Sequence, residues 1–302
     1  MKKIVTFILL TCMILTFAAC SDNGSEPTEN AIPEITTQIL YDASNVPALL
    51  EKHDSVLVVH TANGDAYQED YYSKEYCYTF YDGEEFDHTF LSTNNGFIYN
   101  LEDMYAQAIM ITPDGMADME NLFAEELEKN YLLPDIVNDT ITSATEKDGQ
   151  LIVMNVPDQE ELDAAKAQGW NIVDGEEYVL DAKTLDLISV KGGSVSDSGE
   201  KYEGAMFVTY NAEIPEGMKK LVEYAQQTED MRTVTVVFHS GAENEKSESI
   251  QVSKGLRVEF FADSEQPEEE APFTMYADAA CTQVIEEDLD VNSDVTIYIK
   301  WN

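Results

Sequence analysis

The sequence predicts an α+β protein in which strands outnumber helices. Short runs rich in Val, Ile, Thr, Tyr and Phe recur along the chain, and Asn-Gly, Asp-Gly or Gly-Ser turns separate many of them. This pattern is typical of antiparallel strands joined by hairpins. Apolar residues at steps of three and four mark a few helices between the runs. The residue pattern changes near Arg232, and the chain is long enough to form two domains.

Three helices are predicted from caps and periodicity. Residues 45–52 form the first, and residues 158–168 form the second. Asp158 and Glu161 have the spacing of a capping box at the start of the second helix. Residues 215–231 are expected to form a helix that connects the two domains.

A further, amphipathic helix is predicted over residues 116–131 and ends before Pro134. Its apolar side chains form one stripe, made of Met116, Met119, Leu122, Phe123, Leu127 and Tyr131.

Residues 71–81 are predicted to form one strand with an aromatic face. Continuous alternation places Tyr72, Tyr76, Tyr78 and Phe80 on one side, opposite Glu75, Cys77, Thr79 and Tyr81. A curved sheet packed against helices can enclose an apolar cavity. The candidates for lining such a cavity are Tyr72, Tyr76, Tyr78, Phe80, Met119 and Phe123. The alternative is a filled core without a cavity.

The other predicted strands are residues 55–61, 85–92, 97–99, 105–112, 140–145, 151–156, 178–180, 185–191, 202–210, 234–239, 250–252, 258–261 and 294–301.

The start of the chain has the three parts of a secretory signal. Lys2 and Lys3 precede the apolar run 4–17, and Ala18-Ala19 precede Cys20. The run is shorter than the roughly 20 residues of a membrane-spanning helix. Residues 1–19 resemble a bacterial lipoprotein signal peptide, with Phe-Ala-Ala-Cys as the lipobox. The alternative is an ordinary signal peptide with an incidental cysteine.

The resemblance implies that Cys20 is lipidated and becomes the first mature residue. Acyl chains such as palmitate would then anchor the protein to the outer face of the cell membrane. Residues 20–37 are polar near the cysteine and are predicted to be a flexible tether.

The composition is strongly acidic, with 17 basic and 59 acidic side chains and a formal net charge of −42. Loss of the signal, which carries Lys2 and Lys3, makes the mature chain more negative. Such a chain repels nucleic acid, because nucleic-acid binding depends on cationic contacts to phosphate. A solvated acidic surface explains the charge, although calcium or a cationic partner could also use it.

The chain lacks the motifs of familiar catalytic and metal sites. It has no nucleophile elbow, P-loop or dinucleotide glycine pattern. Its histidines lack the spacing of zinc ligands. We therefore expect a non-enzymatic protein without cofactor or metal. Cys77 and Cys281 are expected to be free thiols, and a disulfide between them is the alternative.

The last seventy residues resemble the Listeria–Bacteroides (internalin B-type) repeat of bacterial surface proteins. The matching segments are 233–238, 276–282 and the closing Ser-Asp-Val-Thr-Ile-Tyr-Ile-Lys-Trp at 293–301. The resemblance implies a small β-grasp-like module over residues 232–302, used for spacing or partner contact. Only one copy is present.

Residues 38–214 more loosely resemble the LolA-like lipoprotein-carrier fold, a curved antiparallel sheet with covering helices. The order of elements and the segment 178–188 carry this resemblance. Two functions follow as hypotheses. One is a membrane-anchored protein that binds a lipid or other amphiphile in its N-terminal domain. The other is a cell-surface interaction or spacer protein that uses its C-terminal module.

Overall fold

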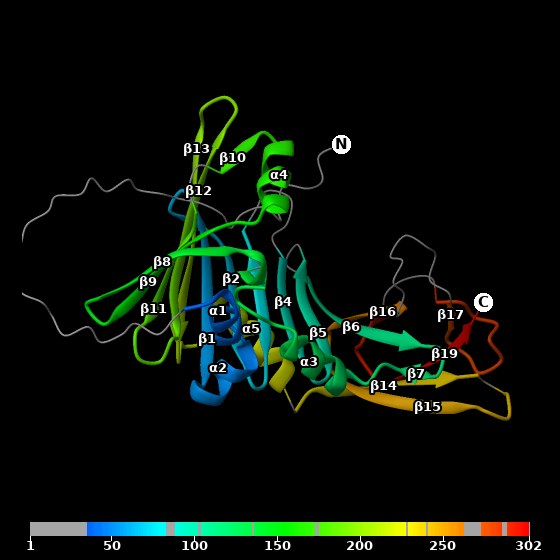
Figure 1. Cartoon of the computed structure of the whole chain (residues 1–302). Helices are drawn as coiled ribbons and strands as arrows, with labels where there is room; N and C mark the ends of the chain where they lie inside the picture. Colours follow the sequence, from blue (N-terminus) through cyan, green and yellow to red (C-terminus); the bar gives the residue numbers. More distant parts are fainter. Residues whose placement is uncertain are drawn as a thin grey trace, which may run out of the picture. The chain divides into compact units, whose positions relative to one another are not determined.

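The computed structural model describes residues 35–82, 88–101, 104–134, 136–172, 175–227, 229–239, 241–262, 273–285 and 289–301. Cys20, the predicted signal and most of the predicted tether lie outside these ranges. Figure 1 shows helices and strands in chain order. The chain divides into two compact units, Met1–Tyr72 with Glu128–Ala212, and Ser73–Leu127 with Glu213–Asn302. We call them unit 1 and unit 2.

Unit 1 contains an antiparallel sheet in the order β2-β1-β13-β12-β11-β9-β8, and β10 also pairs with β12. Alternate residues such as Val58, Met206, Val190 and Tyr178 are buried on one face, as the period of two requires. The strands are β1 (Ser55–Ala62), β2 (Asp65–Ser73), β8 (Thr140–Lys147), β9 (Gln150–Val156), β10 (Trp170–Ile172), β11 (Glu177–Asp181), β12 (Leu187–Ser196) and β13 (Lys201–Tyr210).

The helices of unit 1 begin at side chains that cap them. Asn45 accepts a hydrogen bond from Ala48 N at 2.9 Å, and Asp158 accepts one from Glu161 N at 2.8 Å. The predicted start of the helix at Asp158 is therefore confirmed. The helices are α1 (Thr37–Ala43), α2 (Val46–Lys52), the 3-10 turn η1 (Ile136–Asn138) and α4 (Gln159–Ala167). α1 lies in a segment where no helix was predicted.

Unit 2 contains a mixed sheet in the order β3-β4-β5-β6-β16-β18, in which β16 runs parallel to β6. A second sheet has the order β15-β14-β19-β17, and its central pair β14 and β19 is parallel. The elements are β3 (Cys77–Tyr81), β4 (His88–Thr93), β5 (Gly96–Leu101), β6 (Met104–Thr112), β7 (Gly115–Met116), α3 (Met119–Glu128), α5 (Glu216–Gln226), β14 (Met231–Phe238), β15 (Lys246–Ser253), β16 (Arg257–Ala262), β17 (Phe273–Tyr276), β18 (Leu289–Asp290) and β19 (Val295–Trp301).

The two sheets of unit 2 share one hydrophobic core. Ile109 and Ile111 of β6 are buried in the same cluster as Val236 of β14 and Ile297 of β19. The predicted boundary between residues 38–214 and 232–302 therefore differs from the observed units. Residues 73–127 pack with the C-terminal part because β16 extends the sheet of β6 through parallel pairing.

The α+β class is confirmed, but the single strand predicted at 71–81 is wrong. The chain turns between Ser73 and Tyr76, whose backbone N and O atoms are 2.8 Å apart. Ser73 Oγ also accepts hydrogen bonds from Glu75 N at 3.3 Å and Tyr76 N at 3.1 Å. A serine that bonds to the following backbone favours a turn over a continuous strand.

The amphipathic helix is shorter than predicted. Met116 lies in β7 and pairs with Ile111 of β6, so the helix starts only at Met119. Asp118 accepts a hydrogen bond from Asn121 N at 3.2 Å and so acts as its cap. Tyr131 lies beyond the helix and bridges to Asn45.

Candidate functional site

The six predicted cavity residues are divided between the two units. Tyr72 is half-buried in β2 of unit 1, whereas the other five belong to unit 2. Tyr76 precedes β3, and its hydroxyl accepts a hydrogen bond from Gln226 at 2.8 Å. Phe80 is half-buried in β3.

Two of these residues are buried within unit 2. The Tyr78 side chain is 1% exposed, and its hydroxyl faces Gly217 of α5. Phe123 is 6% exposed on α3. Met119 is half-buried over Gly96 of β5 and lines a pocket. The sequence therefore identified one lining residue of this pocket.

The pocket lies within unit 2 beside the start of α3 and has a volume of about 600 Å³. Its apolar lining includes Ile109 of β6, Met116 of β7 and Ile250 of β15, together with Met119. Its polar lining consists of Asn94, Asn95, Asp118, Glu120, Lys246, Glu248 and Ser249. A lining that mixes apolar and polar side chains suits a ligand that has both kinds of surface.

One side of the pocket is held by bonds between β15 and residues 114–116. Glu248 accepts a hydrogen bond from Met116 N at 2.8 Å and forms an ion pair with Lys246. Lys246 Nζ donates to Asp114 O at 3.2 Å. A Cβ on Gly115 would lie 2.6 Å from the Glu248 carboxylate, so glycine allows this close approach.

Lys246, Glu248 and the Asn94-Asn95 turn were not predicted as site residues. They come from segments far from α3 in sequence, and only the shared core of unit 2 brings them together. Residues 246–249 are all polar, and the strand predicted there covered only residues 250–252, so nothing in this segment indicated a pocket.

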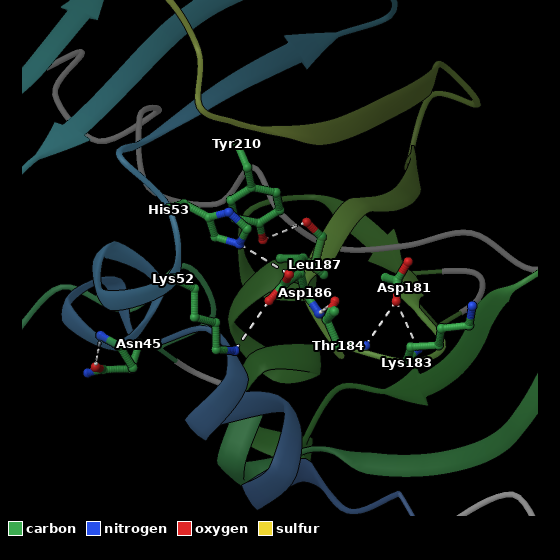
Figure 2. A network of polar contacts seen from close by, with 10 residues as sticks. Asn45, Lys52, His53, Asp181, Lys183, Thr184, Asp186, Leu187 and Tyr210 are labelled. Atoms are coloured by element: carbon green, nitrogen blue, oxygen red, sulfur yellow. Dashed lines mark hydrogen bonds and ion pairs between the residues drawn. The ribbon is translucent and has the colours of Figure 1, made fainter.

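A network of polar side chains surrounds Asp186 in unit 1, as Figure 2 shows. Asp186 is 7% exposed, and its carboxylate is 3.3 Å from Lys52 Nζ and 3.1 Å from His53 Nε2. The His53 ring stacks on Tyr210 with centroids 4.2 Å apart. Tyr210 Oη donates to Leu187 O at 2.9 Å, and burial raises the pKa of this phenol.

The Asp186 network has a structural role. Lys52 stands in the last turn of α2, where a cation interacts favourably with the helix dipole, and His53 is the C-cap of this helix. Asp186 thereby ties the turn between β11 and β12 to α2. Within the described ranges, no serine, threonine or cysteine side chain bonds to His53. The same turn is closed by Asp181, which accepts from Lys183 N and Thr184 N, and these donors lower its pKa.

The described residues contain no group of three or more His, Cys, Asp or Glu side chains placed to hold a metal ion. Cys77 and Cys281 are free thiols, and burial raises the pKa of Cys77 to about 12. No helix in the described part of the chain is both long and apolar enough to cross a membrane.

Neither a known protein family nor a curated protein matches the sequence. Among solved structures, the chain is similar to the lipoprotein LppX of Mycobacterium tuberculosis. The TM-score is 0.31 and the identity 10%, and the match covers 60% of this chain and 99% of LppX. We derive no function from a similarity of this size.

Proposed function

We propose that the protein is a membrane-anchored extracytoplasmic lipoprotein that binds a lipid or other amphiphile without catalysing a reaction. The observation that carries the ligand proposal is the pocket beside α3, whose lining mixes apolar and polar side chains. The leader and Cys20 carry the proposal of the anchor.

The pocket supports an amphiphile for physical reasons. Its volume of about 600 Å³ falls within the range of small-molecule sites. Met116 and Met119 contribute flexible, polarisable side chains that adapt to apolar chains of different shape. Asn94, Asn95 and Glu120 offer polar groups in the lining for a headgroup.

Uptake of an environment-sensitive apolar dye tests the ligand proposal. The full mature chain should enhance the dye fluorescence, and a single-chain amphiphile such as dodecylmaltoside should displace the dye. Met119→Gln should weaken dye binding at least fivefold, because it places an amide among the apolar side chains that line the pocket. Met154→Gln, on β9 of unit 1, is the matched control. Equal binding by both variants would exclude the pocket.

Metabolic labelling with a palmitate analogue tests the anchor. The wild-type protein should carry the label and sediment with membranes, whereas Cys20→Ala should lose both properties. Cys281→Ala is the control, because this residue lies in the folded part. An unlabelled wild-type protein released into the medium would refute the anchor.

Two finer fold comparisons accompany this proposal. A LolA-like arrangement is supported by the antiparallel sheet of unit 1 with α1, α2 and α4. A β-grasp-like module is supported by the parallel central pair β14 and β19.

The second candidate function is a surface interaction or spacer protein, favoured by the resemblance of residues 232–302 to a surface-protein repeat. Deleting these residues would uncover the buried side chains of Ile109 and Ile111, so it would damage unit 2. Partner capture should instead be compared between wild type and Gln251→Lys, an exposed change on β15. Equal capture of a cell-surface partner by this variant would argue against use of the β15 face.

A further inference from the structure

Several carboxyl groups meet at the N-terminal end of α4 in unit 1. Asp139 follows η1, Glu176 precedes β11, and Asp158 and Glu161 belong to the cap and first turn of α4. Asp139 and Glu176 both bond to Asn155, which lies near the end of β9. These segments are far apart in sequence, and the fold of unit 1 brings them together.

Asn155 and Tyr178 use their hydrogen-bonding groups to join the two most buried acids. Asn155 Nδ2 donates to Asp139 Oδ2 and, at 3.1 Å, to the Tyr178 hydroxyl. Asn155 Oδ1 accepts from Glu176 N at 2.8 Å. The Tyr178 hydroxyl donates to Glu176 Oε2. Asn155 and Tyr178 therefore have no further side-chain donor for the second oxygen of either carboxylate.

Two carboxylate oxygens are consequently unsatisfied. Glu176 is 4% exposed, and its Oε1 is buried without a hydrogen-bond partner among the described residues. Asp139 Oδ1 is also buried without a hydrogen-bond partner among the described residues. Neither Asp139 nor Glu176 forms an ion pair with Lys, Arg or His in the described part of the chain. An unpaired, buried negative charge is costly, and a bound proton removes that cost.

The neighbouring groups reinforce this effect. The pKa of Asp139 is raised to about 7, mainly by burial and then by repulsion from Glu161 and Asp158. The pKa of Glu176 is raised to about 8, mainly by burial and then by repulsion from Glu161 and Asp139. The phenol of Tyr178 also has a pKa raised by burial and by Glu176.

We propose that the Asp139–Glu176 cluster is a proton-binding site that controls how firmly α4 is held to the rest of unit 1. With the proton bound, a neutral carboxyl replaces a carboxylate, and it gains a donor that the carboxylate lacks. On deprotonation the proton passes to water, and the cluster becomes a group of facing negative charges.

The structure indicates that α4 is the element released. Asp139 also accepts a hydrogen bond from Asp158 N, the cap of α4, and Glu161 lies in the first turn. Repulsion within the cluster therefore acts directly on the start of this helix. The protein would respond to a rise in external pH by loosening α4 and the neighbouring β10, which contacts it.

Hydrogen exchange of the full mature chain tests the proposal. After correction for intrinsic rates, protection of residues 158–168 should fall at least tenfold between pH 6 and pH 9, while protection of α2 stays constant. Glu176→Gln mimics the protonated group and should retain protection at pH 9. Asp139→Asn provides a second such variant if Glu176→Gln folds poorly. Glu160→Gln is the control, because Glu160 is exposed in the same turn.

Two results would overturn the proposal. One is an unchanged pH profile in both Glu176→Gln and Asp139→Asn. The other is recovery of protection in the wild type at pH 9 on adding calcium chloride, which would identify the cluster as a cation site.

Discussion

Gly217 of α5 lies directly against the hydroxyl of Tyr78 on β3. A Cβ built on Gly217 would be 2.8 Å from Tyr78 Oη, which is shorter than van der Waals contact. Tyr78 is almost completely buried, so its ring has little freedom to move away. This contact sets how closely α5 approaches β3 within unit 2.

The first prediction follows from this contact. Alanine is favoured over glycine in a helix by about 1 kcal/mol, but overpacking of a core costs about 1–3 kcal/mol. Gly217→Ala should therefore fail to stabilise the protein, and Gly217→Val should lower the free energy of unfolding by about 2 kcal/mol or more.

Tyr78→Phe removes the hydroxyl and should reduce the cost of Gly217→Val. Denaturant unfolding of the single and double variants measures this coupling. Additive effects would show that the two side chains do not compete for the same space.

The second prediction concerns Asp186. Asp186→Asn removes a buried charge that faces Lys52 and His53, and it should destabilise the protein by about 2–4 kcal/mol. Lys52→Met should cost less than about 1 kcal/mol, because the Lys52 side chain is 51% exposed. Thermal unfolding of the two variants gives the comparison. Equal losses would mean that the Lys52 pair, not burial of Asp186, carries the stability.

The third prediction is a pH dependence of global stability. Asp139 and Glu176 have a higher pKa in the folded protein, about 7 and about 8, than in the unfolded chain, where about 4 is usual. The folded state therefore binds more protons between these values, so the stability that these groups contribute is present at low pH and is lost as the pH rises to about 8.

Glu176→Gln should be more stable than wild type at pH 9, by on the order of 3 kcal/mol, and the difference should shrink toward pH 5. Denaturant midpoints at several pH values measure it, with Glu160→Gln as the exposed control. A constant difference between variant and wild type across this range would contradict the prediction.

The fourth prediction concerns thiol reactivity. Burial raises the pKa of Cys77 to about 12, so little thiolate forms at pH 8. Cys281 is half-exposed in the turn after β17. Iodoacetamide should label Cys281 at least tenfold faster than Cys77 in the native protein, as mass spectrometry of peptides would show. In urea the two rates should converge, and equal native rates would refute the burial of Cys77.

Local signals in the sequence were read correctly where one short segment decides the structure. Asp158 caps α4 as its spacing to Glu161 predicted, and α2 at Val46–Lys52 falls within the helix predicted over residues 45–52. The strand predicted over residues 151–156 is also observed, and its alternate residues Leu151 and Val153 are buried. Each of these depends on hydrogen bonds or side-chain spacing over a few neighbouring residues.

The break at Ser73 shows where such signals compete. Tyrosine and phenylalanine favour a strand throughout residues 71–81, but the Ser73 hydroxyl bonds to Glu75 N and Tyr76 N and turns the chain. The continuous aromatic face predicted over residues 71–81 is interrupted at this turn, and only Tyr78 and Phe80 remain together in β3. Of the predicted cavity residues, this leaves Met119 in the pocket beside α3.

The amino-acid sequence by itself determined the α+β class, the acidic charge, the caps of the helices and the signal-like leader with Cys20. Tertiary structure alone decided that β16 pairs with β6, that residues 73–127 share a core with the C-terminal strands, and that Asp139 meets Glu176. The reason is physical: periodicity and capping act over a few residues, whereas parallel pairing and buried charge depend on segments that only folding brings into contact.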